Sequence, residues 1–366
     1  MAWAVFFSLL LTHSAGTGKS EMGTAHFLDG YPKARCLDGS PAVYYMSKGS
    51  GAGEKKYMIF HEGGGWCSHG LACYRRSNKR LGSSVNDSET MDMSVADHIK
   101  FSRNPQQNPL MYDWNHIFVR YCDGGFYAGD RAEPVTVFGK KLYSWGKHIT
   151  EALFIDIAGL ESSTDVVLGG CSAGAMHIYA HLDALKKLVP GNARVVGLAD
   201  SGFFLDEEWI TPRLNGAVYA HEGESLLPPQ CLSDYAGRAG MCLLGPVAMK
   251  YLQTPIFALQ SRFDGARHKN VPACTDDICT QAYITKFAAS IASSFEKNKG
   301  GYFLDSCQHH CFYAQWQALP ARPLDDISGL TPLQAFASWY GGGESQYSQA
   351  AVVECAECCN GTLPIQ

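Results

Sequence analysis

The residues best suited to chemistry lie in a glycine-rich segment near the middle of the chain. An apolar run over 165–169 leads into Gly170-Cys171-Ser172-Ala173-Gly174, and a helical pattern follows. A strand, a tight turn and a helix in this order form a nucleophile elbow, which exposes a catalytic serine at a helix N-terminus. The dipole and free N–H groups at that terminus favour negative charge. We therefore predict that Ser172 is a nucleophile. The alternative is a loop rich in glycine and serine in which Ser172 is only the N-cap of the following helix.

A serine hydroxyl needs a base, and the base needs an orienting acid. In elbow-type enzymes the acid follows the serine in the chain and the histidine comes last. Asp264 follows the late apolar run 255–260, whereas Asp200 follows the run that comes directly after the elbow helix. We prefer Asp264 as the acid because it lies later in the chain.

Two adjacent histidines are candidates for the base. His309 and His310 follow another short apolar run and lie between Cys307 and Cys311, whose bridges would hold their loop. A neutral imidazole can accept the serine proton while its second nitrogen donates to the carboxylate. Spacing alone does not separate the two histidines. We expect other histidines, such as His181 and His221, to be surface or core residues.

A second glycine-rich segment is a candidate oxyanion hole. Residues 59–66 (IFHEGGGW) read as a strand running into three glycines, like the HGGG-type loop that supplies N–H groups to a tetrahedral oxyanion. We predict that the donors are Gly64, Gly65 and Ala173. The alternatives are a plain turn or a phosphate-binding loop, but neither of the phosphate-loop glycine patterns occurs here.

The elements needed to position these residues are visible as apolar runs alternating with helical patterns. Continuous apolar runs are typical of strands buried on both faces. The expected strands are 56–62, 116–121, 165–169, 194–198 and 255–260, and the expected helices are 145–158, 173–188 and 280–295. This alternation predicts an α/β fold with a mainly parallel central sheet flanked by helices. Residues 63–80 and 222–240 are expected to be long loops.

Composition agrees with a globular, well-packed protein. Of the 366 residues, 46% are hydrophobic and only 18% are charged, which argues against a disordered chain. The formal net charge is −5, so no broad basic surface is implied and nucleic acid is not an expected partner.

Fourteen cysteines indicate an oxidising compartment, with disulfides stapling the loops of a large core. Closeness in sequence suggests the pairs Cys67–Cys73 and Cys274–Cys279. Irregular spacing argues against a zinc site, although two residues do separate Cys355 from Cys358.

The N-terminus also points to secretion. Residues 3–12 are an apolar run followed by small residues, which resembles a signal peptide and is too short to span a membrane. A buried N-terminal segment is the alternative. We expect residues 1–20 to be a signal peptide and 21–366 to form one domain, a monomer without a membrane span. Asn86 and Asn360 are glycosylation acceptors if the chain is secreted.

From about residue 31 to residue 311 the chain resembles the pectin acetylesterases, the family that also contains the Notum carboxylesterases. The matching segments are 36–45 (CLDGSPAVYY), 61–67 (HEGGGWC), 119–126 (VRYCDGGF), 170–174 (GCSAG), 200–206 (DSGFFLD), 254–264 (TPIFALQSRFD) and 306–311 (SCQHHC). The chain departs from the family pattern at Ala175, where a glycine is usual, and in the residues that flank Asp264.

The resemblance implies an α/β-hydrolase-like fold, disulfides, secretion and no cofactor. It places the acid at Asp264 rather than Asp200, and the base at His310, because the family histidine directly precedes the second cysteine. Trp66 and Asp123 lie in its motifs and are candidate substrate contacts, although we favour structural pairing for Asp123 and Glu62.

We therefore expect a secreted serine esterase that removes O-acetyl groups from pectin-type polysaccharide, with the cell wall as a candidate location. One alternative is a Notum-like carboxylesterase that removes a fatty acyl group from a protein or lipid, which a deep apolar pocket beside Ser172 would favour. The other is an inactive extracellular carbohydrate-binding protein, which would be favoured if Asp264 or His310 lay out of reach of the serine.

Overall fold

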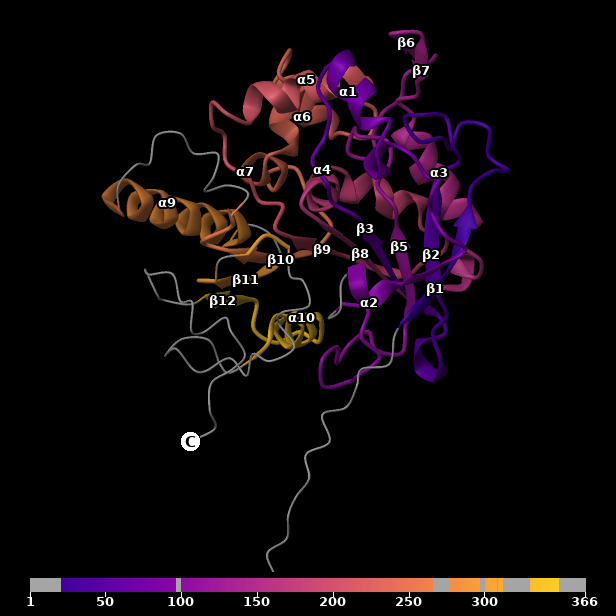
Figure 1. Cartoon of the computed structure of the whole chain (residues 1–366). Coiled ribbons are helices and arrows are strands. Elements are labelled where there is room, and N and C mark those ends of the chain that lie inside the picture. The colour runs from indigo at the N-terminus through magenta and orange to yellow at the C-terminus, as the bar shows by residue number, and fades with distance from the viewer. Residues whose placement is uncertain are drawn as a thin grey trace, which may run out of the picture.

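A ten-stranded sheet runs through the centre of the protein (Figure 1). The structure is a computed structural model that describes residues 21–96, 100–265, 277–296, 300–307, 309–311 and 330–348, with only the backbone described at 95–96 and 277–280. The strands lie in the order β12-β11-β10-β9-β8-β3-β5-β2-β1-β4. Neighbours from β12 to β5 pair in parallel, and β2, β1 and β4 extend the sheet in antiparallel pairs.

The strands of this sheet are β1 (Met22–Phe27), β2 (Val43–Ser47), β3 (Lys56–His61), β4 (Thr90–Asp92), β5 (Asn115–Val119), β8 (Asp165–Cys171), β9 (Arg194–Asp200), β10 (Ile256–Ser261), β11 (Gly301–Asp305) and β12 (Gln346–Ser348). A separate antiparallel hairpin consists of β6 (Val135–Val137) and β7 (Lys140–Leu142). The helices are α1 (Gly70–Arg76), α2 (Met93–Ala96), α3 (Gly146–Asp156), α4 (Ala173–Leu188), α5 (Thr211–His221), α6 (Pro229–Asp234), α7 (Gly245–Ala248), α9 (Asp277–Glu296) and α10 (Pro332–Tyr340).

Helices cover both faces of the sheet, as Figure 1 shows. Side chains that alternate along each strand enter two separate apolar cores. On β3, Tyr57 and Ile59 join the core beneath α3, α4 and α9, whereas Met58 and Phe60 join the core beneath α2 and α10. The predicted α/β fold with a mainly parallel, doubly covered sheet is confirmed.

The sequence located the central strands and long helices well, but not the edge of the sheet. All five expected strands form, and α4 has the predicted bounds. The antiparallel strands β1, β2 and β4 were not predicted; β1 and β4 mix exposed with buried positions, and β4 has only three residues. The expected loops 63–80 and 222–240 contain the short helices α1 and α6.

Four disulfides staple the described part of the chain. They are Cys36–Cys122, Cys67–Cys73, Cys171–Cys311 and Cys231–Cys242, and Cys307 is also disulfide-bonded. The prediction of Cys67–Cys73 is confirmed. The predicted Cys274–Cys279 pair, residues 1–20 and Asn360 lie outside what the structure describes.

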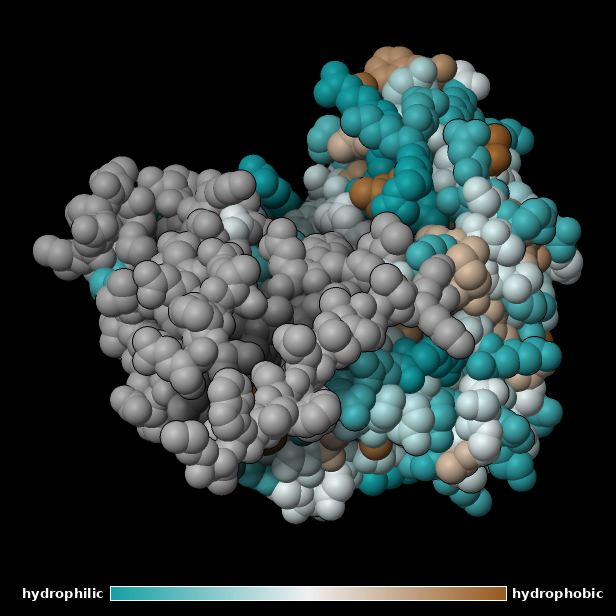
Figure 2. Space-filling view, turned by 60° about the horizontal axis from the view of Figure 1, so that its bottom comes forward, coloured by the Kyte–Doolittle hydropathy of each residue, from teal (hydrophilic) through white to brown (hydrophobic). Residues whose placement is uncertain are grey.

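On the part of the face in Figure 2 that is drawn in colour, hydrophobic residues are scattered among polar ones rather than gathered in one patch. Among the residues described, no helix is both long enough and apolar enough to cross a bilayer.

Candidate active site

Four strands of the parallel sheet end at one edge, and the segment after each carries a predicted site residue. Gly64 and Gly65 follow β3, Ser172 follows β8, Asp264 follows β10 and His310 follows β11. In parallel sheets the carboxyl ends of neighbouring strands form the crevice in which ligands bind. The topology therefore brings together residues that are up to 246 positions apart.

Ser172 occupies the strained turn expected of a nucleophile elbow. Its backbone has φ 55° and ψ −118°, and its N–H donates to the carbonyl of Asp200 at 2.9 Å. The turn is closely packed, because a Cβ added at Gly63 would lie 2.5 Å from the carbonyl oxygen of Cys171. A Cβ at Gly174 would collide with the carbonyl of His61. Only glycine at these positions lets the β3 loop approach the serine so closely.

Ser172, His310 and Asp264 form one continuous chain of hydrogen bonds. The Oγ of Ser172 lies 2.8 Å from Nε2 of His310. Nδ1 of His310 lies 2.8 Å and 3.0 Å from the two carboxylate oxygens of Asp264. Because a carboxylate only accepts, Nδ1 carries the proton and Nε2 offers a lone pair to the serine hydroxyl. This arrangement is that of a nucleophile, a base and an orienting acid.

Asp264 is fully buried and has a further partner that the sequence did not reveal. The amide Nε2 of Gln260 donates to Asp264 Oδ2 at 3.1 Å, and Gln260 Oε1 accepts from the N–H of Phe203. Gln260 thus links the carboxylate to the backbone that follows β9. A polar residue inside the otherwise apolar run 255–260 was the only signal that could have identified it.

The rivals considered from the sequence lie elsewhere. The carboxylate of Asp200 is paired with the buried ammonium of Lys100 at 2.7 Å and accepts from Ser201 Oγ. His309 turns to Asp305, with Nε2 3.0 Å from Oδ2. Burial acts to lower the pKa of His309, but the charge and hydrogen bond of Asp305, together with the charges of Asp200 and Asp264, raise this pKa above its usual value. Neither Asp200 nor His309 enters the hydrogen-bond chain of Ser172.

The loop that contains the candidate oxyanion donors is anchored by Arg76. Gly64 and Gly65 have φ values of 142° and 63°, which only glycine adopts without strain. The guanidinium of Arg76 donates to the carbonyls of Gly64 at 2.9 Å and Leu81 at 2.8 Å. It lies over the ring of Tyr121, 4.9 Å from the centroid. The third predicted donor, Ala173, begins α4 directly after Ser172.

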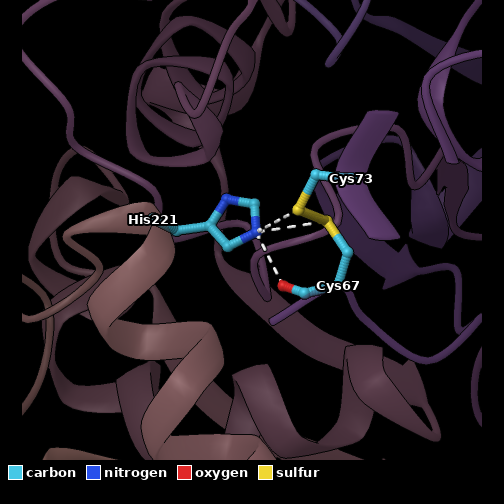
Figure 3. A group of neighbouring side chains, drawn as sticks. All are labelled: Cys67, Cys73 and His221. Atoms are coloured by element: carbon cyan, nitrogen blue, oxygen red, sulfur yellow. Dashed lines mark hydrogen bonds between the residues drawn. A yellow bond between two sulfur atoms is a disulfide. The ribbon is translucent and has the colours of Figure 1, made fainter. Parts of the chain in front are cut away.

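The distal end of this loop is fixed by the Cys67–Cys73 disulfide and His221, drawn in Figure 3. Nε2 of His221, at the end of α5, donates to the carbonyl of Cys67 at 3.0 Å and lies 3.4 Å from its sulfur. These three residues are the one group of potential metal ligands found among the described residues. The sulfurs of Cys67 and Cys73 form a disulfide, so neither is available as a thiolate ligand.

Two acidic residues near the glycine loop have structural partners. Glu62 is paired with Arg80 at 2.5 Å and with buried Arg120, and it accepts from the N–H of Tyr121. Asp123 is fully buried, and its carboxylate accepts from the N–H groups of Gly125 and Tyr127. Burial raises the pKa of Asp123 to about 6. Asp123 thus has the structural role that we favoured for it, and as a candidate substrate contact it does not line the cavity at Ser172.

A cavity of about 840 Å³ opens at Ser172. Its wall includes His310, Trp66 and the glycine loop. Around the serine lie aromatic and apolar side chains together with two arginines, namely Phe60, Leu81, Met91, Phe118, Phe204, Trp209, Arg80 and Arg213. The volume lies within the range of small-molecule sites. The prediction that Trp66 lies near bound substrate agrees with its place in this wall.

A cluster of neutral histidines lies buried behind the elbow. Nδ1 of His177 and Nδ1 of His181 are 2.8 Å apart, and the ring of His61 lies 4.8 Å from that of His177. Nδ1 of His61 donates to the carbonyl of Gly169. Burial lowers the pKa of His61 to about 4 and that of His181 to about 3. These side chains pack β3 against β8 and α4 without contacting the cavity.

The fold and a hydroxyl–imidazole–carboxylate chain beside a cavity define a carboxylic ester hydrolase of the α/β-hydrolase type. The model of the pectinacetylesterase family matches residues 18–364, so the chain belongs to this family.

Individual relatives come from both branches of the family. The chain is 30% identical to pectin acetylesterase 11 of Arabidopsis thaliana over 90% of its own length and 89% of that protein. It is 29% identical to the palmitoleoyl-protein carboxylesterase Notum of Drosophila melanogaster, covering 80% of this chain but 45% of that protein. The crystal structure of the Wnt deacylase Notum from Drosophila superposes with a TM-score of 0.76 at 26% identity, over 92% of this chain and 99% of that one.

Proposed function

We propose that the protein is a secreted esterase that removes O-acetyl groups from an acidic, pectin-type polysaccharide through an acyl-enzyme on Ser172. The observation that carries this proposal is the unbroken chain from Ser172 Oγ through His310 to Asp264 at the mouth of the cavity. An inactive binding protein has no need of this arrangement.

The mechanism follows from the donors and acceptors. His310 Nε2 takes the proton as Ser172 Oγ attacks the acetyl carbonyl, and Asp264 stabilises the resulting imidazolium. The N–H groups of Gly64, Gly65 and Ala173 are the proposed donors to the oxyanion, each contributing about 3 kcal/mol to the transition state. His310 then protonates the sugar oxygen as its bond to the acetyl carbon breaks, and the sugar leaves with a free hydroxyl. Water, deprotonated by the same imidazole, hydrolyses the acyl-enzyme and releases acetate.

The cavity wall supports a sugar acid as the alcohol part of the ester. Trp66 and Trp209 offer aromatic faces for a sugar ring, and Arg213 is exposed on α5. Within the described residues, Arg213 has no carboxylate within salt-bridge distance, so its guanidinium is available to a uronate carboxylate. The similarity to pectin acetylesterase 11, which spans 90% of this chain and 89% of that protein, also supports a pectin-type substrate.

A second candidate is the removal of a longer acyl chain. Phe60, Leu81, Met91 and Phe118 form an apolar part of the wall, and about 840 Å³ exceeds what an acetyl group fills. Relatives in the Notum branch carry the name palmitoleoyl-protein carboxylesterase.

Secretion is supported by the four disulfides, which persist in an oxidising compartment. The acceptor Asn86 is exposed and so accessible to glycosylation.

The test compares wild type with Ser172→Ala on p-nitrophenyl acetate, p-nitrophenyl octanoate and acetylated pectin. The proposal predicts acetate release from pectin, slow cleavage of octanoate, and a loss of kcat by roughly 10³-fold or more in the variant. Faster cleavage of octanoate than acetate, with no release from pectin, would favour the second candidate. Equal residual rates for wild type and variant would refute the esterase mechanism.

A further inference from the structure

An aromatic side chain stands exposed at the tip of the β6–β7 hairpin. Phe138 has 74% of its surface exposed, although phenylalanine is usually buried. The hairpin packs on α1 at one extremity of the molecule, as Figure 1 shows. Phe138 is not part of the cavity wall at Ser172.

The backbone at this tip is unfavourable for phenylalanine. Phe138 and Gly139 have φ values of 48° and 78° and lie between the paired residues Val137 and Lys140. This is a two-residue turn with both φ positive, which favours Asn-Gly because bulky residues are strained there. The ring gains little burial in exchange. Neither the local backbone preference nor burial within the chain therefore accounts for a phenylalanine at this position.

The ring belongs to a small exposed surface that is held rigidly. Phe138 contacts Tyr74 of α1 edge-on, with ring centroids 5.3 Å apart, and Leu71 and Val135 are 40% and 39% exposed. We call these four residues the hairpin surface. Lys140 Nζ fixes the hairpin to the end of α1 by donating to the carbonyl of Ser77 at 3.1 Å and to Asn78 Oδ1 at 2.9 Å.

The two segments that form the hairpin surface carry mostly positive charge. Residues 70–80 and 133–142 contain six lysines and arginines against one exposed acid, Glu133, in a chain whose net charge is −5. Arg75, Lys79 and Lys141 are exposed, and none of them forms an ion pair within the described residues. Exposed aromatic rings and exposed, unpaired cations on the same two elements are complementary to a polyanion made of sugar rings.

The hairpin surface is closely coupled to the active-site cavity. Tyr74 follows Cys73, whose Cα lies 5.1 Å from that of Cys67, and Trp66 of the cavity wall precedes Cys67. The Cα atoms of Tyr74 and Trp66 are therefore no more than about 13 Å apart. The disulfide, braced by His221 in Figure 3, holds the two regions in fixed register. A polymer that passes Trp66 at the cavity wall therefore has to extend only about 13 Å further to reach Tyr74, which contacts Phe138.

We propose that the hairpin surface is a distal subsite that binds the acidic polysaccharide chain several sugars away from the ester being cleaved. The inference rests on the proposed function, because it takes the substrate to be a uronate polymer. Phe138 and Tyr74 contact sugar rings through their apolar faces, while Arg75, Lys79 and Lys141 attract the carboxylates.

The test uses Phe138→Asn, which supplies the residue that the turn favours and should fold at least as well as wild type. The KM for acetylated pectin is expected to rise roughly fivefold to tenfold, the size of one lost ring contact. Hydrolysis of p-nitrophenyl acetate, too small to reach the hairpin, should keep its wild-type kcat and KM.

A second variant, Arg75→Glu/Lys141→Glu, should raise the KM for pectin but not that for neutral acetylated xylan. Ile155→Asn is the matched control, since Ile155 is 73% exposed on α3.

Binding is also measured without catalysis, by retardation of each protein in gels containing unacetylated polygalacturonate. If wild type leaves acetylated pectin intact but Phe138→Asn still loses retardation, the proposed function fails while the subsite stands. If Phe138→Asn matches wild type in both KM and retardation, the subsite is refuted. Loss of binding to phosphatidylserine vesicles, with binding to polygalacturonate unchanged, would assign the hairpin surface to a membrane and also overturn the proposal.

Discussion

The disulfide between Cys171 and Cys311 joins the residue before the serine to the residue after the histidine. The two cysteines are 140 positions apart. The N–H of Cys311 also donates to Ser201 Oγ at 2.8 Å, and Ser201 Oγ donates to Asp200, whose carbonyl accepts from Ser172. One covalent bond and one hydrogen-bond route thus hold the His310 loop against the nucleophile elbow.

Removal of this bridge should impair both catalysis and folding. In Cys171→Ala/Cys311→Ala, we expect the free energy of unfolding to fall by about 3–5 kcal/mol, because a long loop is released in the unfolded chain. The kcat for p-nitrophenyl acetate should fall roughly tenfold to 100-fold, since the geometry of His310 is no longer imposed. Urea titration and steady-state kinetics measure the two effects.

The control is Cys231→Ala/Cys242→Ala, which opens a disulfide between residues 11 positions apart, outside the cavity wall. This variant should lose stability with little change in kcat. Equal kcat losses in both variants would contradict a special role for Cys171–Cys311.

The two candidate acids should separate in their effects. Asp264→Asn is expected to lower kcat by roughly 10⁴-fold with little loss of stability, because the amide no longer orients and stabilises the histidine. Asp200→Asn leaves the buried ammonium of Lys100 without its counter-charge and should cost about 3–5 kcal/mol of stability. Urea titrations and kcat measurements on both variants show which aspartate is the catalytic acid and which is structural. A stable, inactive Asp200→Asn beside an active Asp264→Asn would reverse the assignment.

Arg76 should act as a positioning residue for the glycine loop. In Arg76→Met, the carbonyls of Gly64 and Leu81 lose their donor, and the loop is free to move. We expect kcat for p-nitrophenyl acetate to fall about 10- to 100-fold with a smaller change in KM, because oxyanion contacts act mainly in the transition state. Arg238→Met is the control, since Arg238 is exposed, its guanidinium lies over the ring of Tyr235, and it is not part of the cavity wall. A change confined to KM would show that Arg76 contributes to binding instead.

Buried histidines should make the protein lose stability in mild acid. Burial lowers the pKa of His61 and of His221 to about 4, and that of His181 to about 3. Burial also lowers the pKa of His177 well below its usual value. In the unfolded chain these groups titrate near pH 6.5, so unfolding takes up protons between about pH 6.5 and 4. Each histidine then removes up to about 1.4 kcal/mol per pH unit as pH falls. Asp123 acts in the opposite direction below about pH 6, because its raised pKa lets the native state keep a proton, and it offsets one histidine.

Urea unfolding at a series of pH values from neutral to acid measures this effect. The unfolding free energy should decrease steadily below about pH 6.5. A flat profile over that range would mean that the histidines are not buried in the neutral form.

Local sequence determined the elements and the order of the chemical groups. Continuous apolar runs identify strands buried on both faces, and the step from such a run into Gly170–Gly174 identifies the elbow, because its geometry depends on neighbouring residues alone. In elbow-type enzymes the serine, the acid and the histidine follow successive strands in that order. This order identified Ser172, then Asp264, and then the pair that contains His310. The residues themselves left His309 and His310 equivalent, and the motif resemblance was needed to choose between them.

Only the tertiary structure decided how distant positions meet. Sequence spacing cannot pair Cys171 with Cys311, or place Gln260 against Asp264, because those contacts depend on which strands are neighbours in the sheet. It also cannot show that Asp123 turns inward to cap its own loop while Trp66, in a similar motif, faces the cavity. Side-chain type is written in the sequence, but burial and direction are set by packing between segments far apart in the chain.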